Sequence, residues 1–116
     1  PEVVRQFPAT LCWLSDRALR PGDRFTLRHT TRAVLAVVDQ IVGRLDITTM
    51  STTVTDVLEL NDIGRVILRC AEPIVVDPYE RSRSTGALLL VDEASGATMA
   101  AGMVLDAASA DAASAR

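Results

Sequence analysis

Leu60 to Met103 reads LNDIGRVILRCAEPIVVDPYERSRSTGALLLVDEASGATMAAGM, and this stretch decides the fold of the chain. Its β-branched and aliphatic residues come in short runs, and acidic residues, Gly and Pro stand between them. Arg65–Cys70 alternates with a period of two, which favours a half-buried strand. Three further strands are predicted downstream: Ile74–Val76, which Pro73 opens, Gly86–Val91, and Thr98–Leu105.

The same stretch predicts which side chains face the core and where the chain turns. The alternation in Arg65–Cys70 places Val66, Leu68 and Cys70 on the inward face. Glu93–Ala97 contains a Gly and predicts a hairpin loop between the last two strands. The small residues of Ala100–Met103 predict tight backbone packing at a strand crossing rather than a ligand site.

Two more strands are predicted nearer the N-terminus. Phe7–Leu14 and Arg24–His29 both alternate, so their inward faces are Phe7, Ala9, Leu11 and Trp13 in the first and Phe25, Leu27 and His29 in the second. Between them, Leu19–Asp23 has Pro21 and Gly22 at the two central positions of a type II turn. We expect these two strands to pair antiparallel.

The segment Thr31–Ile47 is ambiguous, because its apolar residues fit both a helical stripe and the alternation of a strand. Gly43 could supply a bend or bulge if the segment is a strand. The polar, Thr-rich Ser51–Thr55 that follows is predicted to be a loop. About six short strands without a convincing helix predict an all-β domain, either a small closed barrel or a sandwich.

Composition is that of one globular domain with an aliphatic core. The 116 residues are 48% hydrophobic but only 3% aromatic, and the net charge is −3. This charge gives no electrostatic reason to bind nucleic acid or an anionic membrane, and no apolar run has transmembrane length. We expect the barrel to occupy residues 1–106 and a low-complexity Ala/Ser tail residues 107–116. The chain begins at Pro1, as an excised domain or fragment would.

Catalytic and cofactor motifs are missing from the sequence. All twelve basic residues are Arg, so neither a P-loop Lys nor a Schiff-base Lys is present. The single His29 is expected to be a hydrogen-bonded core residue rather than a general base. Cys12 and Cys70 are expected to be buried, reduced thiols of a cytoplasmic protein. We predict no catalytic, cofactor-binding or metal-binding residue in this chain.

Two polar clusters were weighed as possible sites. Asp56, Glu59 and Asp62 lie near the Thr-rich segment, but hydration or turn formation explains them better than a cation site does. In Tyr79–Gly86 two Arg flank a loop that opens a buried strand, and Arg is enriched at interface anchors. A solvated loop is the alternative. The candidate interface residues are Tyr79, Arg81 and Arg83.

Several ordered motifs carry a family resemblance over about residues 3–105. They are LCWL at 11–14, PGD at 21–23, RLDI at 44–47, LNDIG at 60–64, DPY at 77–79, RSTG at 83–86 and AGM at 101–103. Together they resemble the C-terminal domain III, of elongation-factor-Tu type, of the large GTPase subunit of bacterial sulfate adenylyltransferase. The resemblance implies a small closed antiparallel Greek-key β-barrel of about six strands, with Thr31–Ile47 as one long curved strand.

The same resemblance implies a role without catalysis. In that family a GTPase domain and two barrels form a subunit that pairs with a smaller catalytic subunit. GTP hydrolysis drives the formation of adenylylsulfate and pyrophosphate from ATP and sulfate, and in some bacteria the large subunit is fused to an adenylylsulfate kinase. GTP, ATP and Mg would therefore bind elsewhere in the full enzyme. This barrel would pack on the GTPase domain, the second barrel and the partner subunit.

Two other readings remain open at the level of the sequence. The first is domain III of a translation elongation-factor-type GTPase, which would bind tRNA or an exchange factor. Such a domain would not be expected to combine LCWL, DPY and TG motifs, and the low Arg excess disfavours RNA. The second is an unrelated ligand-binding barrel, for which no convergent polar pocket is apparent.

Overall fold

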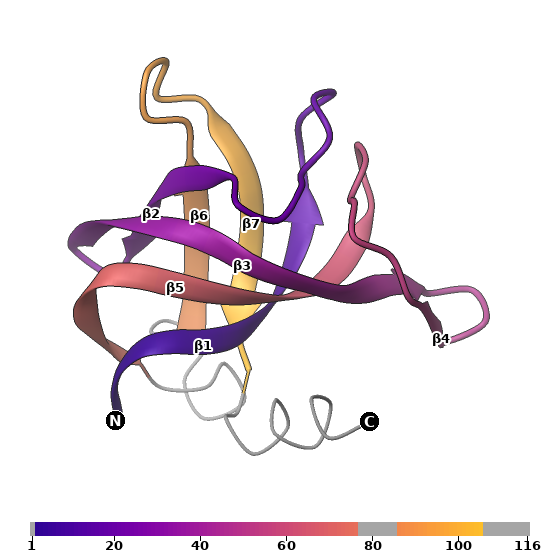
Figure 1. Ribbon diagram of the computed structural model, residues 1–116, viewed down its shortest axis with the longest axis horizontal. Coiled ribbons are helices and arrows are strands. Elements are labelled where there is room, and N and C mark those ends of the chain that lie inside the picture. The colour runs from indigo at the N-terminus through magenta and orange to yellow at the C-terminus, as the bar shows by residue number, and fades with distance from the viewer. Residues whose placement is uncertain (1, 77–85, 106–116) are drawn as a thin grey trace.

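The protein is described by a computed structural model over residues 2–76 and 86–105, and the chain forms an antiparallel β-barrel (Figure 1). Strands β6 and β7 form the wall that lies behind the other strands in this view. The strands are β1 (Glu2–Trp13), β2 (Arg24–His29), β3 (Arg32–Asp46), β4 (Ser51–Thr53), β5 (Ile63–Val76), β6 (Ala87–Val91) and β7 (Thr98–Val104).

Six of these strands close into a ring, and β4 extends it as a side arm. The order runs β2-β6-β7-β1-β5-β3, and a further pairing of β2 with β3 closes the barrel. Strands β2, β3 and β5 follow one another, while β1 lies beside β5, which is a Greek-key arrangement. The closed six-strand antiparallel barrel implied by the resemblance is therefore confirmed.

One predicted pairing is wrong. We expected the strands at Phe7–Leu14 and Arg24–His29 to be partners, but β1 pairs with β5 and β7, and β2 pairs with β3 and β6. A connection of ten residues, Leu14–Asp23, carries the chain from β1 to β2 across the end of the barrel. Alternation predicts the face that a strand buries, but it carries no information about which neighbour the strand takes.

The ambiguous central segment is one long strand, β3, and not a helix. Its register with β5 shifts twice, between Val38 and Gln40 and between Ile41 and Gly43. Bulges of this kind bend a strand, so that it can serve both the barrel and the arm it forms with β4. A Cβ on Gly43 would lie 2.8 Å from the Thr53 carbonyl oxygen, so the close approach of β4 requires Gly here.

Two boundaries differ from the sequence prediction. Ser51–Thr53, expected to be loop, pairs with the end of β3 as β4. The short strand expected to begin after Pro73 is instead the end of a continuous β5. Proline has no backbone N–H to donate to a neighbouring strand. Pro73 is tolerated there because it lies between Arg69 and Ile74, where β5 is not paired with β1.

The predicted inward faces are confirmed. All seven residues predicted to face inward from Phe7–Leu14 and Arg24–His29 are buried, and so are Val66, Leu68 and Cys70. Trp13 contacts Phe25 edge to face, with ring centroids 5.6 Å apart, and its indole Nε1 donates a hydrogen bond to the Arg17 carbonyl oxygen at 2.8 Å. Gly102 packs against β1, where a Cβ would lie 2.6 Å from Leu11 Cδ2, which supports the predicted tight crossing.

Two loops cross at one end of the barrel and bury a leucine each. Leu19 and Leu58, both fully buried, form an isolated antiparallel bridge in which each N–H donates to the other's carbonyl oxygen at 2.8 and 3.1 Å. Leu19 lies in the β1–β2 connection and Leu58 in the connection that precedes β5. Their side chains close this end of the core, a role that alternation within the strands did not reveal.

The turns that follow these two leucines are built alike. In each, the first residue's N–H donates to the side chain of the fourth, Asp23 at 3.0 Å and Asp62 at 2.9 Å. The third residue has a positive φ, 92° at Gly22 and 70° at Asn61. The first turn is the type II turn that its Pro-Gly pair predicts. The pattern Leu-x-x-Gly/Asn-Asp thus occurs twice, at 19–23 and 58–62.

Among the described residues, the buried polar residue is His29, on the inward face of β2. It is 4% exposed and interacts with other groups of the protein. Both cysteines are free thiols, but only Cys70 is buried, whereas Cys12 is half-buried and departs from the expectation. Burial raises the pKa of the Cys70 thiol to about 11. Across residues 2–76 and 86–105 there is no helix long and apolar enough to cross a membrane.

Replacing Leu68 with Ala should lower the free energy of unfolding by about 2–5 kcal/mol, because a fully buried side chain leaves a cavity. Urea unfolding followed by far-ultraviolet circular dichroism measures the loss. Val54→Ala is the control: Val54 is 89% exposed, so its loss should stay within about 0.5 kcal/mol. Similar losses in the two variants would refute the assignment of the core.

Stability should fall as pH rises from 9 to about 11, since the unfolded chain releases the Cys70 proton in this window and the folded chain retains it. The contribution is fully present below the unfolded pKa of 9.0 and is lost as pH rises through the folded value. Urea unfolding of wild type and Cys70→Ala on both sides of the window isolates the effect, which should be on the order of 1 kcal/mol. Equal pH slopes in both proteins would contradict it.

Candidate interaction surface

The residues predicted as an interface, Tyr79, Arg81 and Arg83, lie outside the described residues. The acidic cluster does lie within them, and there Asp62 accepts the hydrogen bond from Glu59 N–H that shapes its turn. Among residues 2–76 and 86–105, no group of three or more His, Cys, Asp and Glu side chains is placed to hold a metal ion. A candidate site must therefore be sought on the outer faces of the strands.

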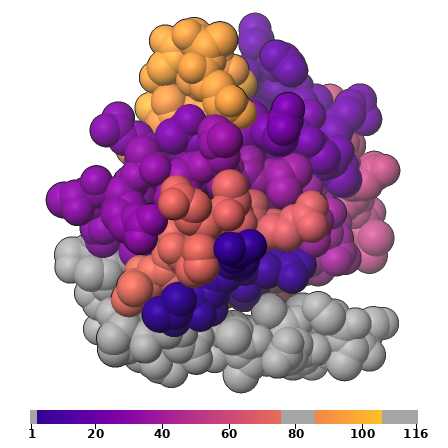
Figure 2. All heavy atoms as spheres, turned by 60° about the vertical axis from the view of Figure 1, so that its left-hand side comes forward, coloured from indigo at the N-terminus to yellow at the C-terminus, as the bar shows by residue number. Residues whose placement is uncertain are grey.

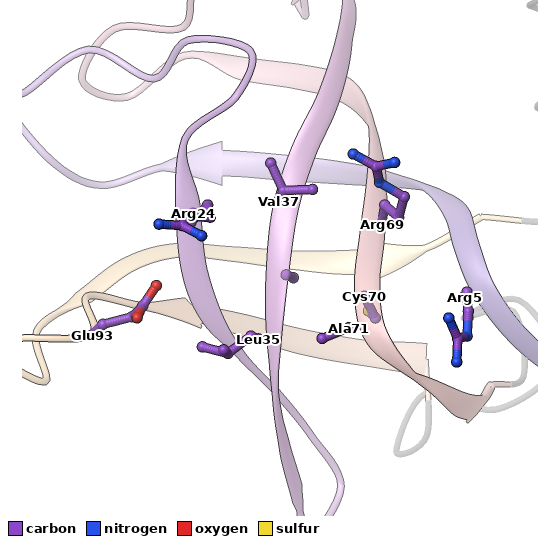
Figure 3. A pocket seen from close by; sticks show the side chains of 9 residues that line it. Arg5, Arg24, Leu35, Val37, Arg69, Cys70, Ala71 and Glu93 are labelled. Atoms are coloured by element: carbon purple, nitrogen blue, oxygen red, sulfur yellow. The ribbon is translucent and has the colours of Figure 1, made fainter.

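An open groove of about 310 Å³ lies on the outer face of β2, β3 and β5 (Figure 3). We call it the arginine groove, and its lining is Arg5, Arg24, Leu35, Ala36, Val37, Arg69, Cys70, Ala71 and Glu93. Figure 2 shows this side of the molecule, where β5 and the first residues of β1 lie beside β3. The groove thus gathers side chains from strands far apart in sequence.

Strand register places three of these residues in one row. Arg24 on β2 is opposite Val37 on β3, and Val37 is opposite Arg69 on β5. All three alternate with buried neighbours, so their side chains must point outward. The row therefore sets two guanidinium groups on either side of an aliphatic side chain.

Irregularities in strand pairing lie beside two further charged residues, Arg5 and Asp39. The pairing of β1 with β5 shifts between Val4 and Gln6, with the surplus residues in β5 between Arg69 and Ile74, and Arg5 lies at this shift and lines the groove. Asp39 occupies the corresponding shift in β3, where its carboxylate lies 3.4 Å from the Arg69 guanidinium and accepts a hydrogen bond from Gln6 Nε2 at 2.9 Å. Asp39 thus offsets the charge of Arg69.

Among the described residues, the other two arginines of the groove, Arg5 and Arg24, are not paired with a carboxylate as Arg69 is. Within the part of the chain that the structure describes, Arg5 and Arg24 form no ion pair. In Figure 3 they stand on opposite sides of the groove, with Glu93 on the side of Arg24. Between them lie Leu35, which is 53% exposed, and Ala71. The groove is therefore an apolar strip between two available guanidinium groups.

The charged and apolar groups of this surface are suited to binding. The thiol of Cys70 stays protonated because its pKa is raised to about 11, and a thiol is a poor nucleophile compared with its thiolate. No His lines the groove to act as a base. Guanidinium groups beside exposed aliphatic side chains are instead suited to carboxylates with apolar neighbours.

Sequence reasoning missed this surface. The outward direction of Arg24 followed from alternation, and the exposure of Leu35 between two buried neighbours could have been noted. The row across three strands depends on register, and the place of Arg5 depends on a bulge. Neither the register between strands nor the position of a bulge can be predicted from the alternation of apolar and polar residues.

Two other surface features have fewer convergent groups. A wider hollow of about 540 Å³ lies over β2, β6 and β7, but among the described residues that line it Arg28 is the only charged one. The arm formed by the end of β3 and β4 projects from the barrel (Figure 1) and exposes Ile47 and Met50 in its turn and Val54 after β4. Neither combines apolar surface with paired charges as the arginine groove does.

Known proteins resemble this chain along most of its length. The family described as GTP-eEF1A C-terminal domain-like matches residues 6–105. "Bifunctional enzyme CysN/CysC" of Mycobacterium tuberculosis is 43% identical over 107 residues, which are 90% of this chain and 17% of that protein. "Sulfate adenylyltransferase subunit 1" of Alteromonas mediterranea is 32% identical over 112 residues, 97% of this chain and 24% of that protein. The chain therefore spans less than a quarter of either relative.

The solved structure of sup35 complexed with GDP has the same fold, with a TM-score of 0.82 at 18% identity over 90% of this chain and 26% of that one. At this identity the likeness concerns the fold alone. The resemblance to sulfate adenylyltransferase read from the sequence motifs is confirmed by the two relatives above. The match over residues 6–105 establishes that this barrel belongs to the GTP-eEF1A C-terminal domain-like family.

Proposed function

We propose that this chain is the accessory C-terminal barrel of the GTP-binding subunit of a sulfate adenylyltransferase. The observation that carries the proposal is the similarity of nearly the whole chain to sulfate adenylyltransferase subunit 1 and to the bifunctional CysN/CysC enzyme. The full enzyme would convert ATP and sulfate into adenylylsulfate and pyrophosphate and couple this reaction to GTP hydrolysis in the cytoplasm.

The barrel's own part in this reaction is mechanical. Its sequence has no Lys and no phosphate-binding loop, so GTP, ATP and Mg would be held by other parts of the enzyme. A closed barrel with a continuous aliphatic core is a rigid body. It would pack on the GTPase domain and second barrel of its subunit and help to carry the GTPase state to the smaller catalytic subunit.

The alternative function is that of domain III of a translation elongation-factor-type GTPase, which would bind tRNA or an exchange factor. The fold likeness to sup35 is compatible with it. Two observations favour sulfate activation: the higher identity, 43% against 18%, and a net charge of −3, which suits tRNA poorly.

A reconstitution experiment tests the function. The 116-residue chain alone should neither release phosphate from GTP nor form adenylylsulfate, because it lacks a phosphate cradle. The complete subunit that contains it, mixed with the smaller catalytic subunit, ATP, sulfate, GTP and Mg, should form adenylylsulfate in a GTP-dependent manner. GTP turnover by the barrel alone, or an inactive complete mixture, would overturn the proposal.

The loop bearing Tyr79, Arg81 and Arg83 stays a predicted interface. Exposed Arg pairs contribute little to stability, so Arg81→Glu with Arg83→Glu should leave the melting temperature of the barrel nearly unchanged. In the complete enzyme the same change should weaken assembly or uncouple GTP hydrolysis from adenylylsulfate formation. A large loss of stability would assign the loop a structural role. Full activity in an intact complex would exclude the interface.

A further inference from the structure

We propose that the arginine groove docks an acidic segment of the smaller catalytic subunit, with carboxylates against Arg5 and Arg24 and an aliphatic side chain over Leu35. The identity of the partner rests on the proposed function. Among the described residues the groove is built from β1, β2, β3, β5 and the residue Glu93 after β6.

Charge complementarity selects an acidic occupant. Arg5 and Arg24 have no carboxylate partner among the described residues, whereas Arg69 already has Asp39 at 3.4 Å. A guanidinium group can form two parallel hydrogen bonds to one carboxylate, so each of the free arginines can hold one acidic side chain. Arg5 and Arg24 lie on opposite sides of the groove (Figure 3), so a ligand that contacts both needs two carboxylates separated by a spacer.

The floor of the groove is apolar, which favours an aliphatic side chain between the two carboxylates. Leu35 is half exposed on a strand whose neighbouring positions, Val34 and Ala36, are buried. Outward-facing Val37 and Ala71 extend the apolar strip on either side. Covering such a strip with an aliphatic side chain removes apolar area from water and strengthens the adjacent charged contacts by excluding solvent.

A nucleotide or nucleic acid fits this groove less well. The described residues of the lining include no aromatic side chain on which a base could stack. Its walls are strands whose N–H groups are largely used by the sheet ladders, so they offer no backbone cradle for phosphate. Glu93 at the rim would repel a polyphosphate more strongly than it would a pair of separated carboxylates.

The exposed charges also favour a separate polypeptide over a domain of the same subunit. Linked domains meet at high effective concentration and need no long-range attraction to find each other. Charges at the rim of an interface mainly raise the association rate of partners that diffuse together. A polar rim around a small apolar strip is the usual form of an interface whose components are also soluble apart.

The closing experiment has two arms. In the first, a peptide with the sequence Glu-Leu-Glu-Leu-Glu is titrated into the ¹⁵N-labelled 116-residue chain. Amide shifts should concentrate at Arg5, Arg24 and Leu35. In the second, association of the complete subunit with the catalytic subunit is followed by biolayer interferometry at low and high salt.

Arg5→Glu with Arg24→Glu should remove the peptide shifts and weaken subunit association at low salt at least about tenfold, with a smaller dependence on salt. Leu35→Ala should weaken it several-fold at both salt concentrations. Arg44→Glu is the matched control, because Arg44 is an exposed arginine on β3 outside the groove, and it should change neither readout by more than about twofold.

The two arms separate the possible failures. An absence of peptide shifts in the wild type, or displacement of the peptide by ATP, would overturn the groove's proposed chemistry. If Arg5→Glu with Arg24→Glu leaves subunit association unchanged, the catalytic subunit is not the occupant of the groove. If the double substitution lowers the melting temperature of the complete subunit, the groove contacts another domain of the same subunit instead. A wild-type subunit that never binds the catalytic subunit, with peptide binding intact, would instead count against the proposed function.

Discussion

The barrel depends on the crossing of two loops at one end, where Leu19 and Leu58 exchange backbone hydrogen bonds. In each loop a turn follows whose first N–H donates to an aspartate side chain. The end of that turn then forms backbone hydrogen bonds with a neighbouring strand, before β2 or β5 begins. Asp23 and Gly22 bond the backbone of Val38, while Asp62 and Asn61 bond that of Trp13. Because buried backbone groups must find partners, this double crossing satisfies loops that would otherwise lie unpaired over the core.

The crossing also sets the surface chemistry. Once Asp23 is bonded to Val38, β2 enters beside β3 with Arg24 opposite Val37, and the next pairing across places Arg69 in the same row. A slip of one residue would send Phe25 outward and the arginine into the core. The same hydrogen bonds that close the barrel therefore align the arginine groove.

What could be predicted from the sequence was local. Alternation identified the buried faces of Phe7–Trp13 and Arg24–His29, and a Pro-Gly pair identified a turn, since both follow from short-range geometry. Partners and bulges depend on contacts between distant residues. For that reason the predicted pairing of β1 was wrong and β4 was missed. The pairing shifts beside Arg5, which lines the groove, and at Asp39, which pairs with Arg69, also gave no signal.

Trp13 is the only tryptophan in the chain, and it sits at the crossing, 1% exposed, with its ring edge-on to Phe25 and its indole nitrogen bonded to the Arg17 carbonyl. An indole in such a dry, fixed environment emits at shorter wavelength than one in water. Its fluorescence is thus an intrinsic probe of one place, the locked end of the barrel. Opening of the crossing loops should shift the emission to the red even while the strands far from Trp13 remain paired.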